Sequence, residues 1–176
     1  MKKQVRIALI AVVLLVAGCG YHVSGGKGSV ASNFGHGIES VAVPIFKNQT
    51  LRAGVEGVIT TALVDDLVNI VEIKPLGIAE ATIEGVIKSY ELSVKSYGDG
   101  DVVSEYRLKV VYSVRLVSSL DGTILWQDRN VSAYADFLVD IASVAITKER
   151  EAKALEEIAR ESARLVRERM AEPFVR

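Results

Sequence analysis

The chain has 176 residues, with 21 basic and 22 acidic side chains and an isoelectric point of about 6.2. This balance excludes the strongly basic surface that nucleic-acid binding requires, and a single cysteine excludes a disulfide within the chain. A chain of this length can bury one substantial core, so we expect a single domain that is held together by packing alone.

Residues 1–18 have the pattern of a bacterial lipoprotein signal peptide. Three basic residues precede an apolar run of about 11 residues, which is too short for a membrane span of about 20 residues. The run ends in Val16-Ala17-Gly18-Cys19, an order that is typical of the lipobox at which bacterial lipoproteins are cleaved and lipidated. We therefore predict that Cys19 carries an N-acyl and an S-diacylglycerol lipid, and we expect no other cofactor.

Two other interpretations of this segment stay open. An ordinary secretory signal also has small residues before its cleavage site, and a lone cysteine is often a buried structural residue. The complete basic, apolar and small order before Cys19 favours lipidation, because an unpaired thiol at the start of a secreted chain has few other uses. Gly20 follows in place of the Asp that favours inner-membrane retention, and by analogy it indicates the outer membrane.

Residues 19–37 are rich in Gly and Ser. Such a stretch buries little apolar surface, so we expect a tether between the lipid and a single domain over residues 38–176. Gly25–Ser29 has a faint likeness to a phosphate-binding loop. It lacks the spacing of that motif and follows no strand, which favours the tether.

The first half of the domain predicts a strand followed by a helix. Residues 38–43 form a compact apolar run that ends at Pro44 and is typical of a buried strand. The side-chain oxygens of Asn48–Thr50 suit the N-terminal cap of a helix. Apolar residues then recur at helical spacing over Val55–Ile70. Val71–Ile73 is a candidate for a further short strand.

Three antiparallel strands are predicted next. Residues 81–94 alternate in polarity but change phase near Ser89, which predicts a β-bulge. Residues 106–116 alternate cleanly between a buried and a wetter face. The sequence Leu120-Asp121-Gly122-Thr123 predicts a hairpin to a partner strand over residues 124–134.

Residues 135–146 show no clear pattern, and a long amphipathic helix begins near Thr147 and ends before Pro173. Together these elements predict an α+β fold. It is a two-layer sandwich in which two helices pack on one face of a four-stranded mixed sheet, in the order strand, helix, three strands, helix.

No catalytic or metal-binding motif is present in the sequence. The only histidines, His22 and His36, lie in the predicted tether, and the HExxH, GxSxG and Walker patterns are absent. The paired carboxylates fall on a helix surface or in a turn, where no nucleophile and base meet. We therefore predict that the protein is not an enzyme and holds no metal ion.

Binding is the remaining class of function, and the wetter face of the sheet carries cations that suit it. The candidate ligand-binding residues are Lys88, Lys95, Arg107, Lys109 and Arg115. Cations beside aliphatic neighbours suit an amphiphile with anionic head groups. The alternative is that these cations only keep an exposed sheet face soluble.

Several segments, taken in order, resemble the LptE (RlpB-like) family of lipopolysaccharide-assembly lipoproteins. The resemblance covers nearly the whole chain after residue 18. It lies in Cys19-Gly20-Tyr21-His22, Ser40–Thr50, Ile59–Leu63, Ala81–Ile87, the strand from Tyr106, and Ser132-Ala133-Tyr134.

The resemblance implies a lipoprotein on the periplasmic side of the outer membrane, and the same fold of two helices on four strands. It also implies that the protein plugs the β-barrel protein LptD, helps LptD to assemble, and binds lipopolysaccharide for delivery to the cell surface. It assigns no lipopolysaccharide contact to a particular residue, so the five cations stay a hypothesis. The acidic charge of the chain without residues 1–18 favours plugging over tight lipopolysaccharide binding.

Two alternative functions belong to other classes. A pilotin-like or other structural lipoprotein that faces the periplasm would suit a small tethered domain equally well. A lipid-anchored hydrolase would depend on His22 or His36.

Overall fold

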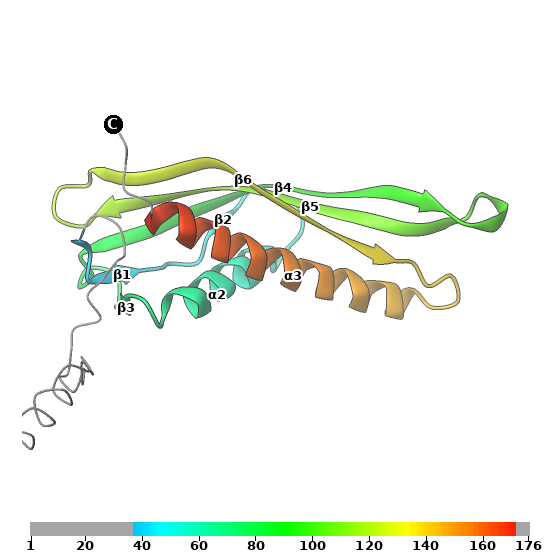
Figure 1. The fold of residues 1–176 in the computed structure, drawn as a ribbon, viewed down its shortest axis with the longest axis horizontal. Coiled ribbons are helices and arrows are strands. Elements are labelled where there is room, and N and C mark those ends of the chain that lie inside the picture. The colour runs from blue at the N-terminus through cyan, green and yellow to red at the C-terminus, as the bar shows by residue number, and fades with distance from the viewer. Residues whose placement is uncertain (1–36, 172–176) are drawn as a thin grey trace, which may run out of the picture.

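Two helices lie on one face of a mixed sheet whose three long strands run the length of the molecule (Figure 1). The computed structural model describes residues 37–171, so Cys19, His22, His36 and the predicted signal peptide lie outside the described residues. The elements are β1 (Ser40–Ala42), β2 (Lys47–Asn48), α2 (Val55–Leu67), β3 (Glu72–Ile73), β4 (Ala81–Tyr97), a 3₁₀ turn η2 (Asp99–Asp101), β5 (Val103–Ser118), β6 (Ile124–Leu138) and α3 (Val144–Ala171).

The α+β class, the mixed sheet and the two helices are confirmed, whereas the predicted strand number of four is wrong. The sheet has six strands, in the order β3-β1-β4-β5-β6, and β2 pairs separately with β4. β1 is parallel to β3 and β4, while β4, β5 and β6 are antiparallel. The additional strands β2 and β3 have only two residues each. Such short strands show no alternation in sequence, although Val71–Ile73 did mark the position of β3.

The starts of both helices differ from the predicted boundaries. Gly54, not Asn48–Thr50, is the N-cap of α2, and it has a positive φ of 90° and no side-chain cap. The Oδ1 atom of Asn48 accepts a hydrogen bond from the Thr50 N–H, and its Nδ2 donates to Glu56, so these oxygens shape the loop instead. Helix α3 begins earlier than predicted, because the Asp140 carboxylate accepts backbone hydrogen bonds that turn the chain into the helix.

The predicted β-bulge is confirmed by a shift of the β4–β5 register between Ile87 and Ser89. Strand β6 continues to Leu138, into the region that the sequence pattern left unassigned. The clean alternation predicted for residues 106–116 is also confirmed. Leu108, Val110, Tyr112, Val114 and Leu116 are all buried in the single core between the sheet and the helices.

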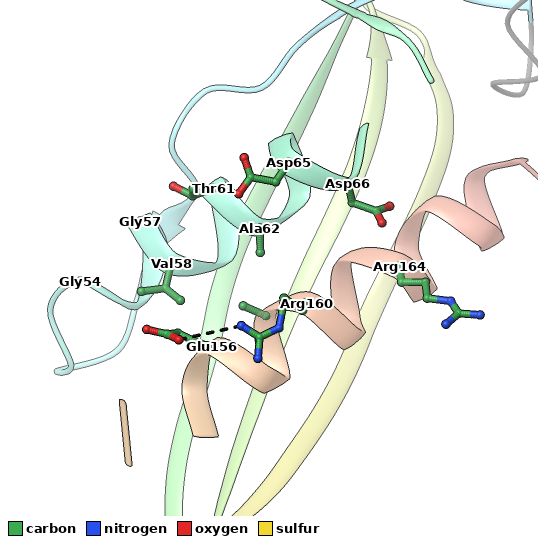
Figure 2. Close-up of a pocket in the computed structure, with 11 residues that line it drawn as sticks. Gly54, Gly57, Val58, Thr61, Ala62, Asp65, Asp66, Glu156, Arg160 and Arg164 are labelled. Carbon is green, nitrogen blue, oxygen red and sulfur yellow. Dashed lines mark ion pairs between the residues drawn. The ribbon is translucent and has the colours of Figure 1, made fainter. Parts of the chain in front are cut away.

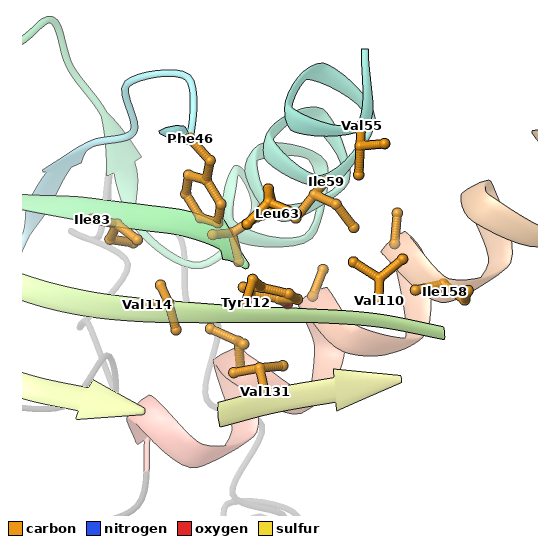
Figure 3. Packing of buried hydrophobic residues seen from close by; sticks show 14 of the residues in the cluster. Phe46, Val55, Ile59, Leu63, Ile83, Val110, Tyr112, Val114, Val131 and Ile158 are labelled. Atoms are coloured by element: carbon orange, nitrogen blue, oxygen red, sulfur yellow. The ribbon is translucent and has the colours of Figure 1, made fainter. Parts of the chain in front are cut away.

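The core is closed at its centre by aromatic rings from two strand segments (Figure 3). Phe46 precedes β2 and lies 6.0 Å from Tyr112 of β5, measured between ring centroids. Tyr112 is almost fully buried, and this burial raises the pKa of its hydroxyl to about 12 despite a hydrogen bond with Ser162 of α3. The aromatic pair therefore connects the sheet to the C-terminal helix.

Phe46 reaches this position because the chain makes a detour between β1 and β2. Both strands pair with the same edge of β4, at Ala81 and at Val86, but the stretch from Val41 to Lys47 is one residue longer than its partner stretch. Pro44 lies within the detour, where it can donate no ladder hydrogen bond.

The ring of Phe46 lies directly on Gly85 of β4. A Cβ atom at residue 85 would overlap the ring carbons of Phe46. The backbone N–H of Phe46 donates to the Oγ1 atom of Thr60 in α2 at 3.0 Å, which fixes the ring to the first helix as well. Phe46 thus joins β4 and α2, two elements that lie far from each other in the sequence.

Replacing Gly85 with Ala should destabilise the fold, because the added methyl group overlaps the Phe46 ring. We expect a loss of about 1–3 kcal/mol in the free energy of unfolding, which urea denaturation would measure. Gly57→Ala is the matched control, because nothing lies within 4 Å of a Cβ at this helical position. It should leave stability unchanged or raise it by about 0.5–1 kcal/mol. Equal losses in both variants would contradict the proposed contact.

Candidate ligand-binding surface

The outer face of the sheet, opposite the helices, carries all five cations that the sequence singled out. In β5, Arg107, Lys109 and Arg115 alternate with residues that point into the core. Lys88 and Lys95 of β4 reach across β5 to contact β6, through the Arg129 carbonyl and the Asp136 carboxylate. The structure places the five cations on one face, but it divides them into two groups with different partners.

The first group lies toward the tip of the β4–β5 hairpin and forms a closed ionic network. The guanidinium of Arg107 binds Asp136 through two hydrogen bonds, of 2.8 and 3.0 Å, and lies 4.3 Å from the centroid of the Tyr134 ring. The Nζ atom of Lys95 lies 2.8 Å from Asp136 and 3.1 Å from Glu105. Two cations thus face two carboxylates, and no net positive charge is left for an anion.

The pKa shifts in this network agree with its geometry. Hydrogen bonds from Arg107, and then from Lys95, hold the pKa of the Asp136 carboxyl well below its usual range. The same contacts raise the pKa of Lys95 and of Arg107. The network therefore stays ionised at neutral pH, and these two predicted ligand-binding cations pair within the sheet.

The second group surrounds a concavity of about 430 Å³ on the outer face, near the middle of the sheet. Lys88 and Arg115 of the five candidate cations line it, together with Lys47 of β2 and Arg129 of β6. Arg115 pairs with Glu84, with 2.8 Å between Nε and Oε2. Within residues 37–171, no carboxylate forms an ion pair with the other three cations.

The lining of the concavity combines this positive charge with apolar side chains. Pro44, Ile45 and Val86 contribute apolar surface, and the Ile45 side chain is 71% exposed. The second carboxylate of the lining, Asp128, is paired with Arg169 of α3. The concavity can therefore hold an anionic group such as a phosphate beside a short apolar segment.

Sequence reasoning missed Lys47 and Arg129 for separate reasons. Lys47 lies on the two-residue strand β2, which no periodicity predicts. Arg129 lies where the β5–β6 register shifts, between the pairs Tyr112–Val131 and Val114–Asp128. Side-chain parity along β6 changes at this point, so counting alternate residues cannot assign Arg129 to a face.

Lys109 lies between the two groups. Its register partners are Glu91 on β4 and Tyr134 on β6, and its own side chain is exposed. Within the described residues it forms no hydrogen bond or ion pair with either neighbour. Among the five candidate cations, Lys109 is thus the one that neither pairs with a carboxylate in the described residues nor lines the concavity.

A second hollow, of about 770 Å³, lies between α2 and α3 on the opposite side of the molecule (Figure 2). Gly57, Ala62 and Ala159 form its small-residue floor. Its rim has both signs of charge, including the pair between Arg160 and Glu156. This mixture favours neither an anion nor a cation.

No group of three or more His, Cys, Asp or Glu side chains could hold a metal ion among residues 37–171. No helix in that same range is long and apolar enough to cross a membrane.

Comparison with known proteins places the described domain in a family. Residues 38–170, which are most of the chain, match the family described as LptE, lipopolysaccharide-assembly. This chain belongs to the LptE family. The resemblance predicted from its sequence segments is therefore confirmed, and an LptE-family chain is a lipopolysaccharide-assembly lipoprotein at the level of its family.

Two solved structures with TM-scores above 0.5 have the same fold as this LptE-family chain at low sequence identity. A lipoprotein B from Nitrosomonas europaea is 14% identical, with a TM-score of 0.53, over 73% of this chain and 79% of that one. A chain from Caulobacter crescentus CB15 that is classed with the lipoproteins has 12% identity and a TM-score of 0.53, over 72% and 87%. The rare lipoprotein B from Shewanella oneidensis is 20% identical, with a TM-score of 0.49, over 75% and 93%. No curated protein sequence matches this chain.

Proposed function

We propose that this chain is the LptE subunit of a lipopolysaccharide translocon. In this proposal a lipid on Cys19 anchors it to the periplasmic side of the outer membrane. Its domain plugs the β-barrel of LptD and assists the assembly of that barrel, and it binds lipopolysaccharide for delivery to the cell surface. The observation that carries the proposal is the family match over residues 38–170. The lipobox order that ends at Cys19 supports the anchor.

The outer face of the sheet supports the plugging role. The interior of an outer-membrane barrel is polar, and a sheet face that contacts it should carry satisfied polar groups instead of apolar ones. The pairs of Arg115 with Glu84 and of Arg107 with Asp136 supply such groups along β5. Side chains that are already paired can contact a polar wall without leaving an uncompensated charge.

The basic concavity supports lipopolysaccharide binding and revises its predicted location. Lys47, Lys88, Arg115 and Arg129 converge there beside Ile45, which suits a phosphorylated and acylated ligand. Lys95 and Arg107 are assigned to the stability of the hairpin instead, because both bind Asp136. Lys109 remains a secondary candidate.

The LptE family is a family of non-enzymatic lipoproteins. The same property is proposed for this chain, whose work is then binding and assembly. A lipid on Cys19 would be its only covalent group.

Tagged full-length chain, co-expressed with LptD from the same genome, should co-purify with LptD from detergent-solubilised outer membranes. The Cys19→Ala variant lacks the lipid, so its membrane association should weaken and depend on LptD alone. It should retain part of its LptD binding, because the folded domain makes the contact. The measurement is the ratio of LptD to tagged chain after purification. Absence of LptD from the wild-type sample would contradict the proposal and favour a pilotin-like role.

Reversing charge in the concavity should weaken lipopolysaccharide binding. The variant Lys47→Glu/Lys88→Glu removes two cations that no described carboxylate pairs with, so the fold should be retained. Its affinity should fall by at least tenfold at low salt, with a smaller difference at high salt. Lys148→Glu/Arg160→Glu, on helix α3, is the matched control with the same change in net charge. Equal affinities of the two variants would refute the concavity as the binding site.

A further inference from the structure

Strand β4 has neighbours on both sides over its first half and on one side only over its second half. β1 pairs with it at Ala81 and Thr82, and β2 pairs with it at Val86 and Ile87. The Gln49 N–H then donates to the Ile87 carbonyl at 3.0 Å, just before the chain turns toward α2. From this point the β4–β5 hairpin extends past β2 and α2 (Figure 1).

The open edge of β4 is the stretch Ser89–Val94, which lies between the bulges at Lys88 and Lys95. Within residues 37–171 its backbone pairs only with β5, and no side chain of that range forms a hydrogen bond with it. In an antiparallel pair, every second residue directs both its N–H and its C=O away from the neighbouring strand. The open edge therefore presents a row of backbone donors and acceptors that an extended chain can pair with.

The other edge of the sheet, β6, is protected near its middle. The β5–β6 register shifts there, and the Nζ atom of Lys88 donates to the Arg129 carbonyl at 2.8 Å. The Asn130 N–H donates to the Asp128 carboxylate, also at 2.8 Å. Bulges and charged side chains of this kind keep an edge strand from pairing with another chain. The open edge of β4 has such bulges only at its two ends.

Side chains of the open edge alternate between two environments. Leu92 and Val94 lie on the helix side of the sheet and are 45% and 40% exposed, although Leu108, which pairs with Leu92 on β5, is fully buried. Glu91 and Ser93 lie on the outer face, and Glu91 forms no ion pair within the described residues. A strand added beside β4 would cover the remaining apolar surface and place a side chain opposite Glu91.

We propose that an extended segment of the barrel protein LptD adds to the open edge of β4 as a further strand of this sheet. The inference rests on the proposed function, in which the barrel of LptD encloses this domain, and it names a contact between the two chains. In this mode of recognition main-chain hydrogen bonds give affinity and alternate side chains give specificity. The added segment has apolar residues on the helix side, polar residues on the outer face, and a Lys or Arg opposite Glu91.

The added segment comes from a loop or a terminal stretch of LptD. A closed barrel has no free edge, because each of its strands pairs on both sides, whereas loops can fold into the lumen of a barrel and plug it. A segment of about six residues, a usual strand length, covers the whole of Ser89–Val94. A second copy of this chain could pair with the same edge, but a barrel that encloses one domain leaves it no access.

Hydrogen–deuterium exchange tests the pairing without any substitution. The full chain is measured alone and in complex with co-expressed LptD, in the same detergent. The outward-facing amides of Ser89–Val94 should exchange about tenfold more slowly in the complex, because the added strand gives them acceptors. The amides of residues 124–130 on β6 report the effect of enclosure alone. Equal slowing at the two edges, or no slowing at Ser89–Val94, would overturn the inference.

Two pairs of substitutions test the side chains of the contact. Leu92→Lys/Val94→Lys places charge where the apolar residues of the added segment pack, at positions that are already partly exposed. The ratio of LptD to tagged chain after purification should fall by about threefold or more. Leu76→Lys/Ile78→Lys, at two exposed positions between β3 and β4, is the matched control with the same change in net charge, and it should leave the ratio unchanged. Equal ratios for the two variants would contradict the contact. If Leu92→Lys/Val94→Lys does not fold, the exchange measurement decides.

The outcomes separate this inference from the proposed function. A wild-type chain that does not co-purify with LptD would overturn the proposed function, and the inference with it. Co-purification with unchanged exchange at Ser89–Val94 would overturn the inference alone. Slower exchange at the open edge that depends on the concentration of the chain without LptD would show pairing between two copies, and it would also overturn the inference.

Discussion

The packing of Phe46 on Gly85 is the contact on which the rest of this structure depends. It requires a glycine in the buried first half of β4, and it places the Phe46 ring, which belongs to the detour between β1 and β2, between the sheet and α2. On the helix side, the Oγ1 atom of Thr60 accepts a hydrogen bond from the Phe46 N–H. Tyr112 packs against Phe46 and makes a hydrogen bond with Ser162 of α3. Sheet, first helix and last helix are thus joined through two aromatic rings, without a disulfide among the described residues.

Both helices pack on one face of the sheet, so the other face is available for binding (Figure 1). Its charges have two distinct roles. Toward the hairpin tip, Asp136 and Glu105 neutralise Arg107 and Lys95, so this part is a polar surface without excess charge. Near the middle, cations from β2, β4, β5 and β6 meet beside apolar side chains and retain a positive excess. The proposed function, contact with a polar barrel wall and binding of an anionic amphiphile, would use both kinds of surface.

Periodicity was a good guide wherever one side of an element is buried over many residues. It placed the buried face of β5, the bulge at Ser89 and most of the packing stripe of α3. The two-residue strand β2 forms only through its pairing with a distant segment, so no local pattern marks it, whereas Val71–Ile73 marked the position of β3 but not its place in the sheet. For the same reason, only two of the four cations around the basic concavity could be named from the sequence. Lys88 and Arg115 follow from the alternation of residues along their strands. Lys47 and Arg129 depend on how β2 and β6 pair with their neighbours.

The central claim is that this LptE-family chain moves lipopolysaccharide to the cell surface through an outer-membrane complex. Controlled depletion of the chain in its own cell, followed by quantification of newly made lipopolysaccharide at the surface, tests that claim most directly. The account predicts that surface lipopolysaccharide falls as the chain is depleted, that it accumulates inside the envelope, and that the wild-type chain restores it. Unchanged surface lipopolysaccharide after complete depletion would contradict the account.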